Sequence, residues 1–178
     1  MIVCAGNNET FDFALPIGVG LVESAMNLTR LCLFDKPEFI LFVGSAGSYG
    51  KHAIFEIIES KTAANIELGF LSQSAYTPID NVVSSQTQNV KDVMVNSSNY
   101  ITTSGNAMKQ FQNLGLGIEN MEFFSVMRVA QEFNIPAGGV FCVTNYCDTN
   151  AHRDFIANHD QAKALLAEHL KKRSVSHG

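Results

Sequence analysis

The chain has 178 residues and a mass of 19.4 kDa, a length that suits a single domain over residues 1–178. Hydrophobic residues make up 46% and charged residues 16%, which excludes a chain that is disordered as a whole. Twelve Lys and Arg against 17 Asp and Glu give a net charge of −5, which disfavours nucleic-acid coating. No run approaches the ~20 apolar residues of a membrane helix, and the N-terminus lacks a signal-peptide pattern. Neither nucleic acid nor a membrane is an expected partner.

The cysteines and histidines show no spacing that is typical of a metal site. Three of the four cysteines stand within apolar runs, so buried free thiols in a reducing cytosol are expected. The cysteines are Cys4, Cys32, Cys142 and Cys147. The sequence therefore predicts a cytoplasmic protein without a bound metal ion.

The first part of the chain alternates apolar runs with one amphipathic segment. Residues 2–5 are apolar, as in a strand, and residues 7–10 resemble a loop. Residues 21–34 carry apolar side chains at a period of about 3.6 residues, which predicts a helix. Residues 39–43 form a continuous apolar run, typical of a strand that is covered on both faces. The small residues 44–47 follow at its carboxyl end.

The middle of the chain is harder to interpret. Residues 53–71 favour two strands. Ser, Thr, Gln and Asn recur throughout residues 72–98, which predicts a long surface excursion. Residues 99–103 predict a short strand.

The last third again alternates helix and strand patterns. Residues 121–133 predict a helix that is apolar on more than one side, and residues 137–143 a buried strand. Residues 151–172 predict an amphipathic terminal helix, with Phe155 on its apolar side. Strands that alternate with helices indicate an α/β layer fold with a largely parallel sheet.

Two glycine motifs are candidates for a phosphate-binding loop. Gly18-Val19-Gly20 opens a helix but lacks the third glycine of a dinucleotide fingerprint, so a Rossmann-type binder is not favoured. Residues 44–51 resemble a Walker loop, but the glycine spacing is one residue too long and His52 replaces Ser or Thr. Small residues at a strand's carboxyl end let a ligand approach the backbone, but a tight structural turn explains residues 44–47 slightly better.

Three polar residues stand where an α/β protein keeps its ligands, and each has two interpretations. Glu122 near a helix start either complements the helix dipole or accepts hydrogen bonds from a sugar diol. Asn145 and Asp148 follow a buried strand and either contact a ligand or form a turn.

Three segments together resemble the purine nucleoside phosphorylase and methylthioadenosine/S-adenosylhomocysteine nucleosidase superfamily. Residues 17–48 are similar to its GIG-helix-KPD-strand-GSAG block, and residues 104–108 to its SGDAF segment. Residues 120–148 are similar, without a gap, to its EMEAxAIAxVCxxFNVPFVVVRAISDxAD block. The resemblance implies a three-layer α/β/α fold with a twisted, largely parallel mixed central sheet. It also implies a purine nucleoside site at the carboxyl ends of the strands.

The resemblance further implies a role for each matching residue. Glu122 would clamp the 2′- and 3′-hydroxyls of the ribose, Asn145 would contact the base, and Met108 would pack on the ring face. The implied substrate-binding residues are Ser45, Ala46, Gly47, Met108, Met121, Glu122, Thr144 and Asp148. The implied catalytic residues are Asn145 and Glu9.

Several residues depart from the family pattern. Asn145 replaces an Asp that acts as general acid; an amide delivers no proton but stabilises negative charge on the leaving base. Phe11 occupies the position of the acid that activates water, which leaves Glu9 or Asp12 as displaced substitutes. Phe42 or Val43 stands where the phosphorylases place a phosphate-binding Arg.

The sequence thus predicts an enzyme that cleaves the N-glycosidic bond of a purine nucleoside. Hydrolysis and phosphorolysis both stay open, with no cofactor, and with phosphate as co-substrate if the enzyme is a phosphorylase. The expected assembly is a homodimer or a larger homo-oligomer. The alternative is a catalytically impaired, nucleoside-binding or structural paralogue, since the general acid and the acidic run after Gly6 are lost together.

Overall fold

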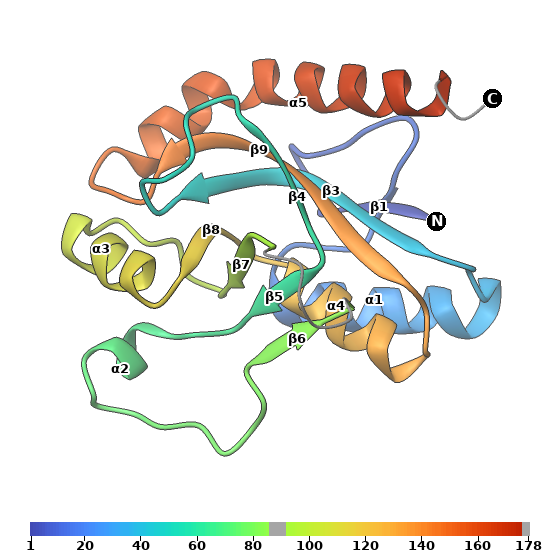
Figure 1. Ribbon diagram of the computed structural model, residues 1–178. Helices are drawn as coiled ribbons and strands as arrows, with labels where there is room; N and C mark the ends of the chain where they lie inside the picture. Colours follow the sequence, from blue (N-terminus) through green and yellow to red (C-terminus); the bar gives the residue numbers. More distant parts are fainter. Residues whose placement is uncertain (86–91, 176–178) are drawn as a thin grey trace.

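A computed structural model describes residues 1–85 and 92–175 of the chain (Figure 1). The described strands form one nine-stranded sheet. The strands are β1 (Ile2–Cys4), β2 (Leu15–Pro16), β3 (Ile40–Ser48), β4 (Ile57–Ser60), β5 (Thr62–Ala64), β6 (Val82–Ser84), β7 (Met94–Ser97), β8 (Leu116–Asn120) and β9 (Ala137–Tyr146). The helices are α1 (Gly20–Asp35), α2 (Leu68–Leu71), α3 (Gly105–Asn113), α4 (Phe123–Glu132) and α5 (Ala151–Val175).

The sheet is mixed, and β3 stands at its centre. β3 runs parallel to β9 along its whole length and parallel to β1 near its start. Near its end, β3 pairs antiparallel with β8, which continues through β7 and β5 to β6. The end of β3 therefore lies between β8 and β9, whose side chains flank it.

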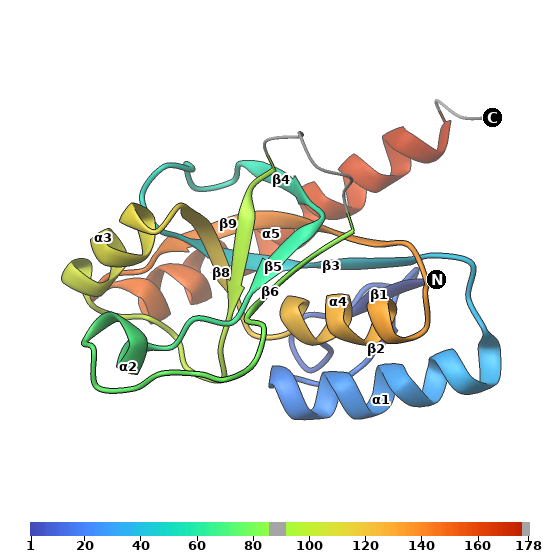
Figure 2. The same cartoon turned by 60° about the horizontal axis from the view of Figure 1, so that its bottom comes forward.

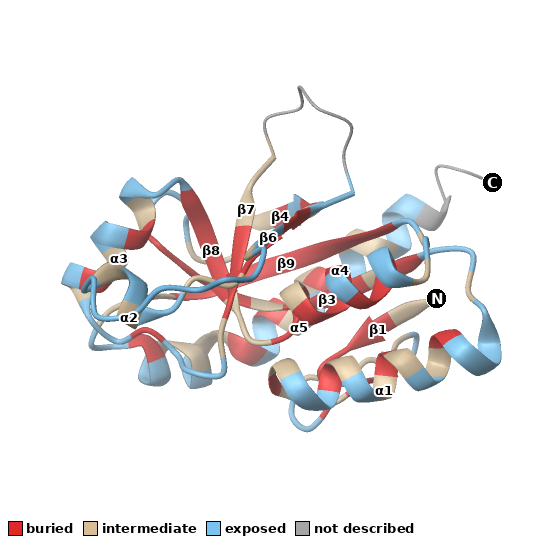
Figure 3. Ribbon diagram, turned by 90° about the horizontal axis from the view of Figure 1, so that it is seen from below, coloured by how far each residue is buried: buried red, intermediate tan, exposed pale blue. Residues whose placement is uncertain are grey.

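Helices cover both faces of this sheet (Figures 1 and 2). α5 packs on one face, over β9 and β3, whereas α1 and α4 lie together on the other face. On the α4 side, the rings of Phe42, Phe123 and Phe141 form a core cluster with centroids 5.1 to 6.2 Å apart. Figure 3 shows β3 and β9 buried between the layers. The three-layer α/β/α fold with a mixed sheet is confirmed.

Most of the predicted elements are confirmed. β1, α1, α4, β9 and α5 form where the apolar patterns place them. β4 and β5 are the two strands that residues 53–71 favoured. All four cysteines are buried and free, as expected. Within the described residues, none of the helices is long and apolar enough to cross a membrane.

Residues 44–47 do not form a turn. β3 continues through them to Ser48, because β9 on one side and β8 on the other supply partners for the backbone. A register shift between Ala46 and Gly47 marks a bulge there. The small residues therefore belong to a buried strand, where a Cβ atom on Gly44 or on Gly47 would lie 2.8 Å from a neighbouring side chain.

The predicted surface excursion over residues 72–98 is wrong in part. It contains β6 and the buried strand β7; residues 86–91 of the excursion lie outside the described residues. β7 tolerates polar side chains in the core because they are hydrogen-bonded: Asn96 bonds both the N–H and the carbonyl of Ile66. The strand predicted at 99–103 is wrong, because these residues have an irregular backbone. The Thr102 N–H there donates to the side chain of Glu119 and not to a neighbouring strand.

Candidate active site

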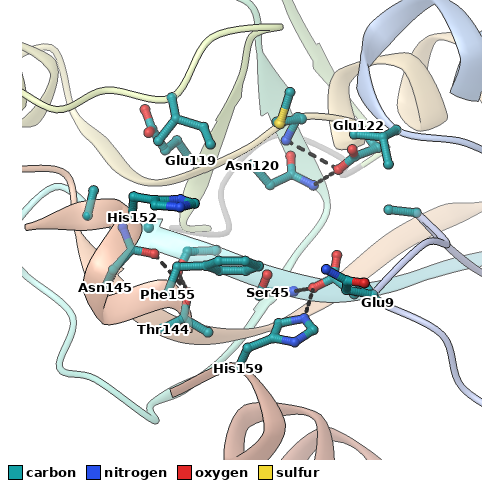
Figure 4. Close-up of a pocket in the computed structure, with 18 of the residues that line it drawn as sticks. Glu9, Ser45, Glu119, Asn120, Glu122, Thr144, Asn145, His152, Phe155 and His159 are labelled. Atoms are coloured by element: carbon teal, nitrogen blue, oxygen red, sulfur yellow. Dashed lines mark hydrogen bonds and ion pairs between the residues drawn. The ribbon is translucent and has the colours of Figure 1, made fainter. Parts of the chain in front are cut away.

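A cleft of about 300 Å³ opens where β3 and β9 end. The loop after β1, the β8–α4 junction and the first turns of α5 form its walls (Figure 4). The carboxyl ends of parallel strands are the usual ligand site of α/β folds, because they bring several loops together.

The turn after β1 places Glu9 inside this cleft. Gly6 and Asn7 have φ of +96° and +54°, which turns the chain back, and the Glu9 N–H donates to the Gly6 carbonyl at 2.9 Å. The Glu9 carboxylate then accepts a hydrogen bond from the backbone N–H of Ser45 on β3. Its side chain is 14% exposed. Burial raises the pKa of the Glu9 carboxyl, and the hydrogen bond from Ser45 opposes that shift.

His159 on α5 faces Glu9 across the floor of the cleft. Its Nε2 lies 3.9 Å from Glu9 Oε1, too far for a direct hydrogen bond, and has no hydrogen-bond partner among the described residues. The residue is 7% exposed, and burial lowers the pKa of its ring, which favours neutral imidazole. A buried nitrogen without a partner beside a carboxylate is a suitable place for a water molecule.

Glu122 stands at the start of α4, on the same side of the cleft as Glu9 (Figure 4). Its Oε1 accepts from the Gly20 N–H at 2.9 Å, and its Oε2 from Asn120 Nδ2 and the Met121 N–H, each at 3.3 Å. The residue is 4% exposed. Burial raises the pKa of Glu122 to about 7, and the nearby charge of Glu9 adds to the shift.

Asn145 lies across the cleft from these two carboxyl groups (Figure 4). The Thr144 hydroxyl donates to its Oδ1 at 2.8 Å, and its Nδ2 donates to the Tyr146 carbonyl at 3.1 Å. These bonds fix the amide plane. The ring of Phe155 from α5 projects into the space between Asn145 and Ser45. The cleft thus has a carboxylate side, an amide side and an aromatic ring between them.

Most of the predicted site residues come together here. Those that line the cleft are Glu9, Ser45, Ala46, Gly47, Met121, Glu122, Thr144 and Asn145. The structure places Met108 and Asp148 elsewhere. Met108 on α3 packs against the cluster of Tyr49 and Phe111, and Asp148 accepts the N–H of Asn150 at 2.8 Å in the turn before α5.

The sequence did not indicate several residues that line the cleft: Tyr100, Ile101, Glu119, Asn120, His152, Phe155 and His159. Three of them follow helical spacing along α5 at 152, 155 and 159, a pattern that marks one helix face but does not separate a core face from a ligand face. Glu119 belongs to β8, a strand that the sequence did not predict.

The cleft is lined by acidic side chains that no Lys or Arg of the described lining offsets. Its lining contains the carboxyl groups of Glu9, Glu119 and Glu122 but neither Lys nor Arg among the described residues. The described residues also hold no cluster of three or more His, Cys, Asp or Glu that could bind a metal. Such a site favours neutral, hydroxyl-bearing ligands over phosphate.

The fold and cleft define an α/β protein of the nucleoside phosphorylase type, and comparison with known proteins agrees. The family model that describes the Phosphorylase superfamily matches residues 2–173 of the chain. The chain therefore belongs to the Phosphorylase superfamily, and the enzyme class that the sequence resemblance implied is confirmed.

Individual relatives are distant. The 5′-methylthioadenosine/S-adenosylhomocysteine nucleosidase of Haemophilus ducreyi is 25% identical over 170 residues, covering 83% of this chain and 73% of the relative. The Helicobacter pylori enzyme of that name, with butyl-thio-DADMe-Immucillin-A, superposes with a TM-score of 0.81 at 15% identity, covering 98% and 97% of the two chains. Helicobacter pylori futalosine hydrolase superposes at 0.79 with 16% identity, covering 96% and 94%. The structural likenesses show the shared fold.

Proposed function

We propose that the chain hydrolyses the N-glycosidic bond of a purine nucleoside and uses Glu9 as the base that activates water. One observation carries the proposal: the Glu9 carboxylate and the unpartnered His159 Nε2 lie 3.9 Å apart inside the cleft. A water molecule beside both atoms could donate one proton to Glu9 while the imidazole orients it. The nucleosidase named among the relatives supports the same class of reaction.

The charge of the cleft favours water over phosphate as the nucleophile. Phosphate sites in proteins use Arg, Lys or clusters of backbone N–H groups to offset the anion. The described lining has no such cation, and the nearby Glu9 and Glu122 would repel a dianion. Phosphorolysis is therefore the less favoured of the two reactions.

In the proposed reaction, Glu122 holds the 2′- and 3′-hydroxyls while the bond between C1′ and the base breaks. The bonding electron pair leaves with the purine, and the Asn145 N–H stabilises the negative charge that develops there. The water oxygen bonds to C1′, and one of its protons passes to Glu9. Glu9 then releases this proton to solvent, and the purine anion takes up a proton from solvent. Free sugar and free base are the products.

A nucleoside-binding paralogue without turnover is the second candidate. Asn145 favours it, because the amide cannot protonate the leaving base. Glu9 favours the enzyme, because its buried carboxylate lies 3.9 Å from the unpartnered His159 Nε2 inside the cleft. Turnover decides between the two.

The test is a nucleoside panel of adenosine, inosine, guanosine and methylthioadenosine, incubated with and without phosphate. Chromatography of the base and a reducing-sugar assay report hydrolysis, whereas ribose 1-phosphate reports phosphorolysis. We expect base release at the same rate in both conditions. A dependence on phosphate would refute the hydrolysis, and binding without release would support the paralogue.

Glu122→Ala should weaken nucleoside binding far more than free-base binding. A charge-assisted hydrogen bond contributes roughly 1.5–3 kcal/mol, so the loss should be about tenfold or more. Isothermal titration with a nucleoside and with its base measures both. Equal weakening of the two ligands would show that Glu122 does not contact the sugar.

We also propose that the chain forms a homodimer or a larger homo-oligomer. Large apolar side chains are exposed along the outer face of α1: Val22, Met26, Leu33 and Phe34 are 56 to 79% exposed. Light scattering should therefore return at least two chains of 19.4 kDa. Met26→Lys should shift the mass toward the monomer, while Ile156→Lys, at an exposed site on α5, should not. A monomeric wild-type protein at micromolar concentration would contradict the proposal.

A cytoplasmic location is part of the proposal. Burial raises the pKa of all four thiols, so they stay in the unreactive thiol form at neutral pH. Free thiols of this kind suit a reducing compartment.

A further inference from the structure

Lys163 joins α5 to the loop between β1 and β2, residues 5–14. Its Nζ donates a hydrogen bond to the Asn8 carbonyl at 3.2 Å and lies over the ring of Phe11, 5.7 Å from the centroid. Both partners belong to this loop, and Asn8 directly precedes Glu9. Lys163 does not line the cleft, whereas Asn8 and Glu9 do. The lysine therefore contacts the loop that carries the proposed base from outside the cleft.

The place of Lys163 follows from the helical repeat of α5. The side chains of this helix that line the cleft are those of His152, Phe155 and His159. Lys163 stands one further turn along the same face, four residues after His159. Phe11 also packs against the buried apolar cluster that contains Leu166 of α5. The helix thus presents one row of side chains, first to the cleft and then to the loop.

The loop has little to hold its shape besides such contacts. Its backbone bonds largely to itself: the Glu9 N–H donates to the Gly6 carbonyl at 2.9 Å and the Ala14 N–H to the Phe11 carbonyl at 3.1 Å. Asn8 is exposed. Segments with few contacts to the rest of a protein open most easily. The hydrogen bond from Lys163 therefore restricts Asn8 and, through it, the direction of Glu9.

The charge of Lys163 favours the protonation states that the proposed reaction needs. Burial raises the pKa of Glu9, whereas the hydrogen bonds from Ser45 and the charge of Lys163 lower it. Burial lowers the pKa of His159, and Lys163 lowers it further, whereas the charge of Asp160 raises it. Both effects of the lysine favour an ionised Glu9 beside a neutral His159.

Two further titratable groups face Glu9 from other elements. Burial raises the pKa of Glu122 at the start of α4, and the charge of Glu9 adds to that shift. Burial also raises the pKa of the Cys4 thiol on β1, so this group carries no charge at neutral pH. Lys163 therefore offsets the negative charge that Glu9 and Glu122 place at this end of the cleft.

We propose that Lys163 is the positioning residue of the base Glu9: it fixes the loop between β1 and β2 against α5 and places a positive charge near the Glu9 carboxylate. The inference rests on the proposed function, because it requires Glu9 to act as the base. Lys163 lies outside the cleft, so its loss should lower kcat and leave KM nearly unchanged.

The experiment removes the charge and the hydrogen bond together with Lys163→Met, which keeps a long side chain. At neutral pH, kcat should fall by up to about 10²-fold, the cost of a misplaced reacting group. The acidic limb of the pH profile of kcat should move to higher pH, because the pKa of Glu9 rises when the positive charge is lost. Lys163→Arg keeps the charge and the donors and should restore both the rate and the profile.

Lys172→Met is the matched control, because it removes one positive charge from the same helix. Lys172 pairs with Glu168 at 2.6 Å and does not line the cleft. Its loss should change neither kcat nor the pH profile. A loss of rate in Lys163→Met that Lys163→Arg does not restore would show a merely structural role and overturn the inference.

Carbon-13 NMR of the Glu9 carboxyl group is a second measurement, and it needs no turnover. The midpoint of its titration should be higher in Lys163→Met than in wild type. Nucleoside hydrolysis by wild type, with a midpoint and a pH profile that Lys163→Met does not shift, would overturn this inference alone. A shifted midpoint in a chain that cleaves no nucleoside would instead overturn the proposed function. If Lys163→Met does not fold, Lys163→Gln, which keeps a donor but no charge, should show the same shift.

Discussion

Replacing Glu9 by Gln is expected to lower kcat for nucleoside hydrolysis by about 10²- to 10⁴-fold, the usual effect of losing a general base. The Gln oxygen can still accept the hydrogen bond from the Ser45 N–H, so the cleft should keep its shape. KM should therefore change little. Single-turnover and steady-state rates for a cleaved nucleoside measure the effect.

Asp12→Asn is the matched control for Glu9→Gln. Asp12 is the other carboxylate near the first strand, but it is exposed and does not line the cleft. Its removal should leave kcat within about twofold of wild type, as for most surface substitutions. A loss of rate in Asp12→Asn, with Glu9→Gln fully active, would reverse the assignment.

The pH dependence gives an independent view of Glu9. A base acts only when it is ionised, and burial raises the pKa of Glu9 above the usual value of about 4.3. The rate should therefore fall, as the pH is lowered, at a higher pH than for an ordinary carboxylate. Glu122 has a pKa of about 7, so its protonation should weaken sugar binding and lower the rate further as the pH falls. In Glu9→Gln, the residual activity should still fall with the protonation of Glu122, but the fall caused by the protonation of Glu9 should be absent.

Asn145→Asp is expected to raise cleavage of adenine nucleosides by about 10²- to 10⁴-fold, the usual contribution of a general acid. The Thr144 hydroxyl can still donate to the first carboxyl oxygen, and the second would lie near the Tyr146 carbonyl. Two oxygens this close favour the protonated acid, which would then be ready to donate to the leaving purine. The preference should shift from inosine toward adenosine.

The measurement compares inosine and adenosine, by binding and by turnover, for Asn145→Asp and wild type. Thr144→Val in the wild-type background removes the hydroxyl that orients the amide and should weaken binding of both nucleosides. An unchanged preference in Asn145→Asp would mean that residue 145 does not face the base, and the placement of the purine would be withdrawn.

Apolar patterns predicted the central elements because those elements are covered on one or both faces. β9 and α5 illustrate this: the strand is buried over almost its whole length, and the helix packs one side on it. β7 could not be predicted in the same way. Its buried Asn96 and Ser97 are satisfied by Ile66 and Asn120, which are distant in the sequence, so hydropathy alone marks this strand as surface. The single domain over residues 1–178 stays a prediction.

The candidate site was only partly predictable for a similar reason. Counting along the family pattern put Phe11 in the position of the water-activating acid. The turn at Gly6 and Asn7 instead brings Glu9 to Ser45. A left-handed turn changes which of the following residues faces the interior, and the hydropathy pattern does not reveal that change. Met108 matched a motif, but α3 directs it toward the Tyr49 cluster. Local spacing identifies an element, whereas the direction of its side chains depends on what packs around it.

Gly47 shows how a strand can leave room for the side chains of its neighbours. Its backbone is extended within β3 rather than left-handed, so no rule of turn geometry demands a glycine there. What demands it is volume, because a single methyl group would lie 2.8 Å from Cys147 Sγ and 3.0 Å from Asn145 Nδ2. A larger residue at that point would therefore have to displace the Cys147 thiol or the Asn145 amide. The glycine thus preserves the position of the Asn145 side chain, which lines the cleft.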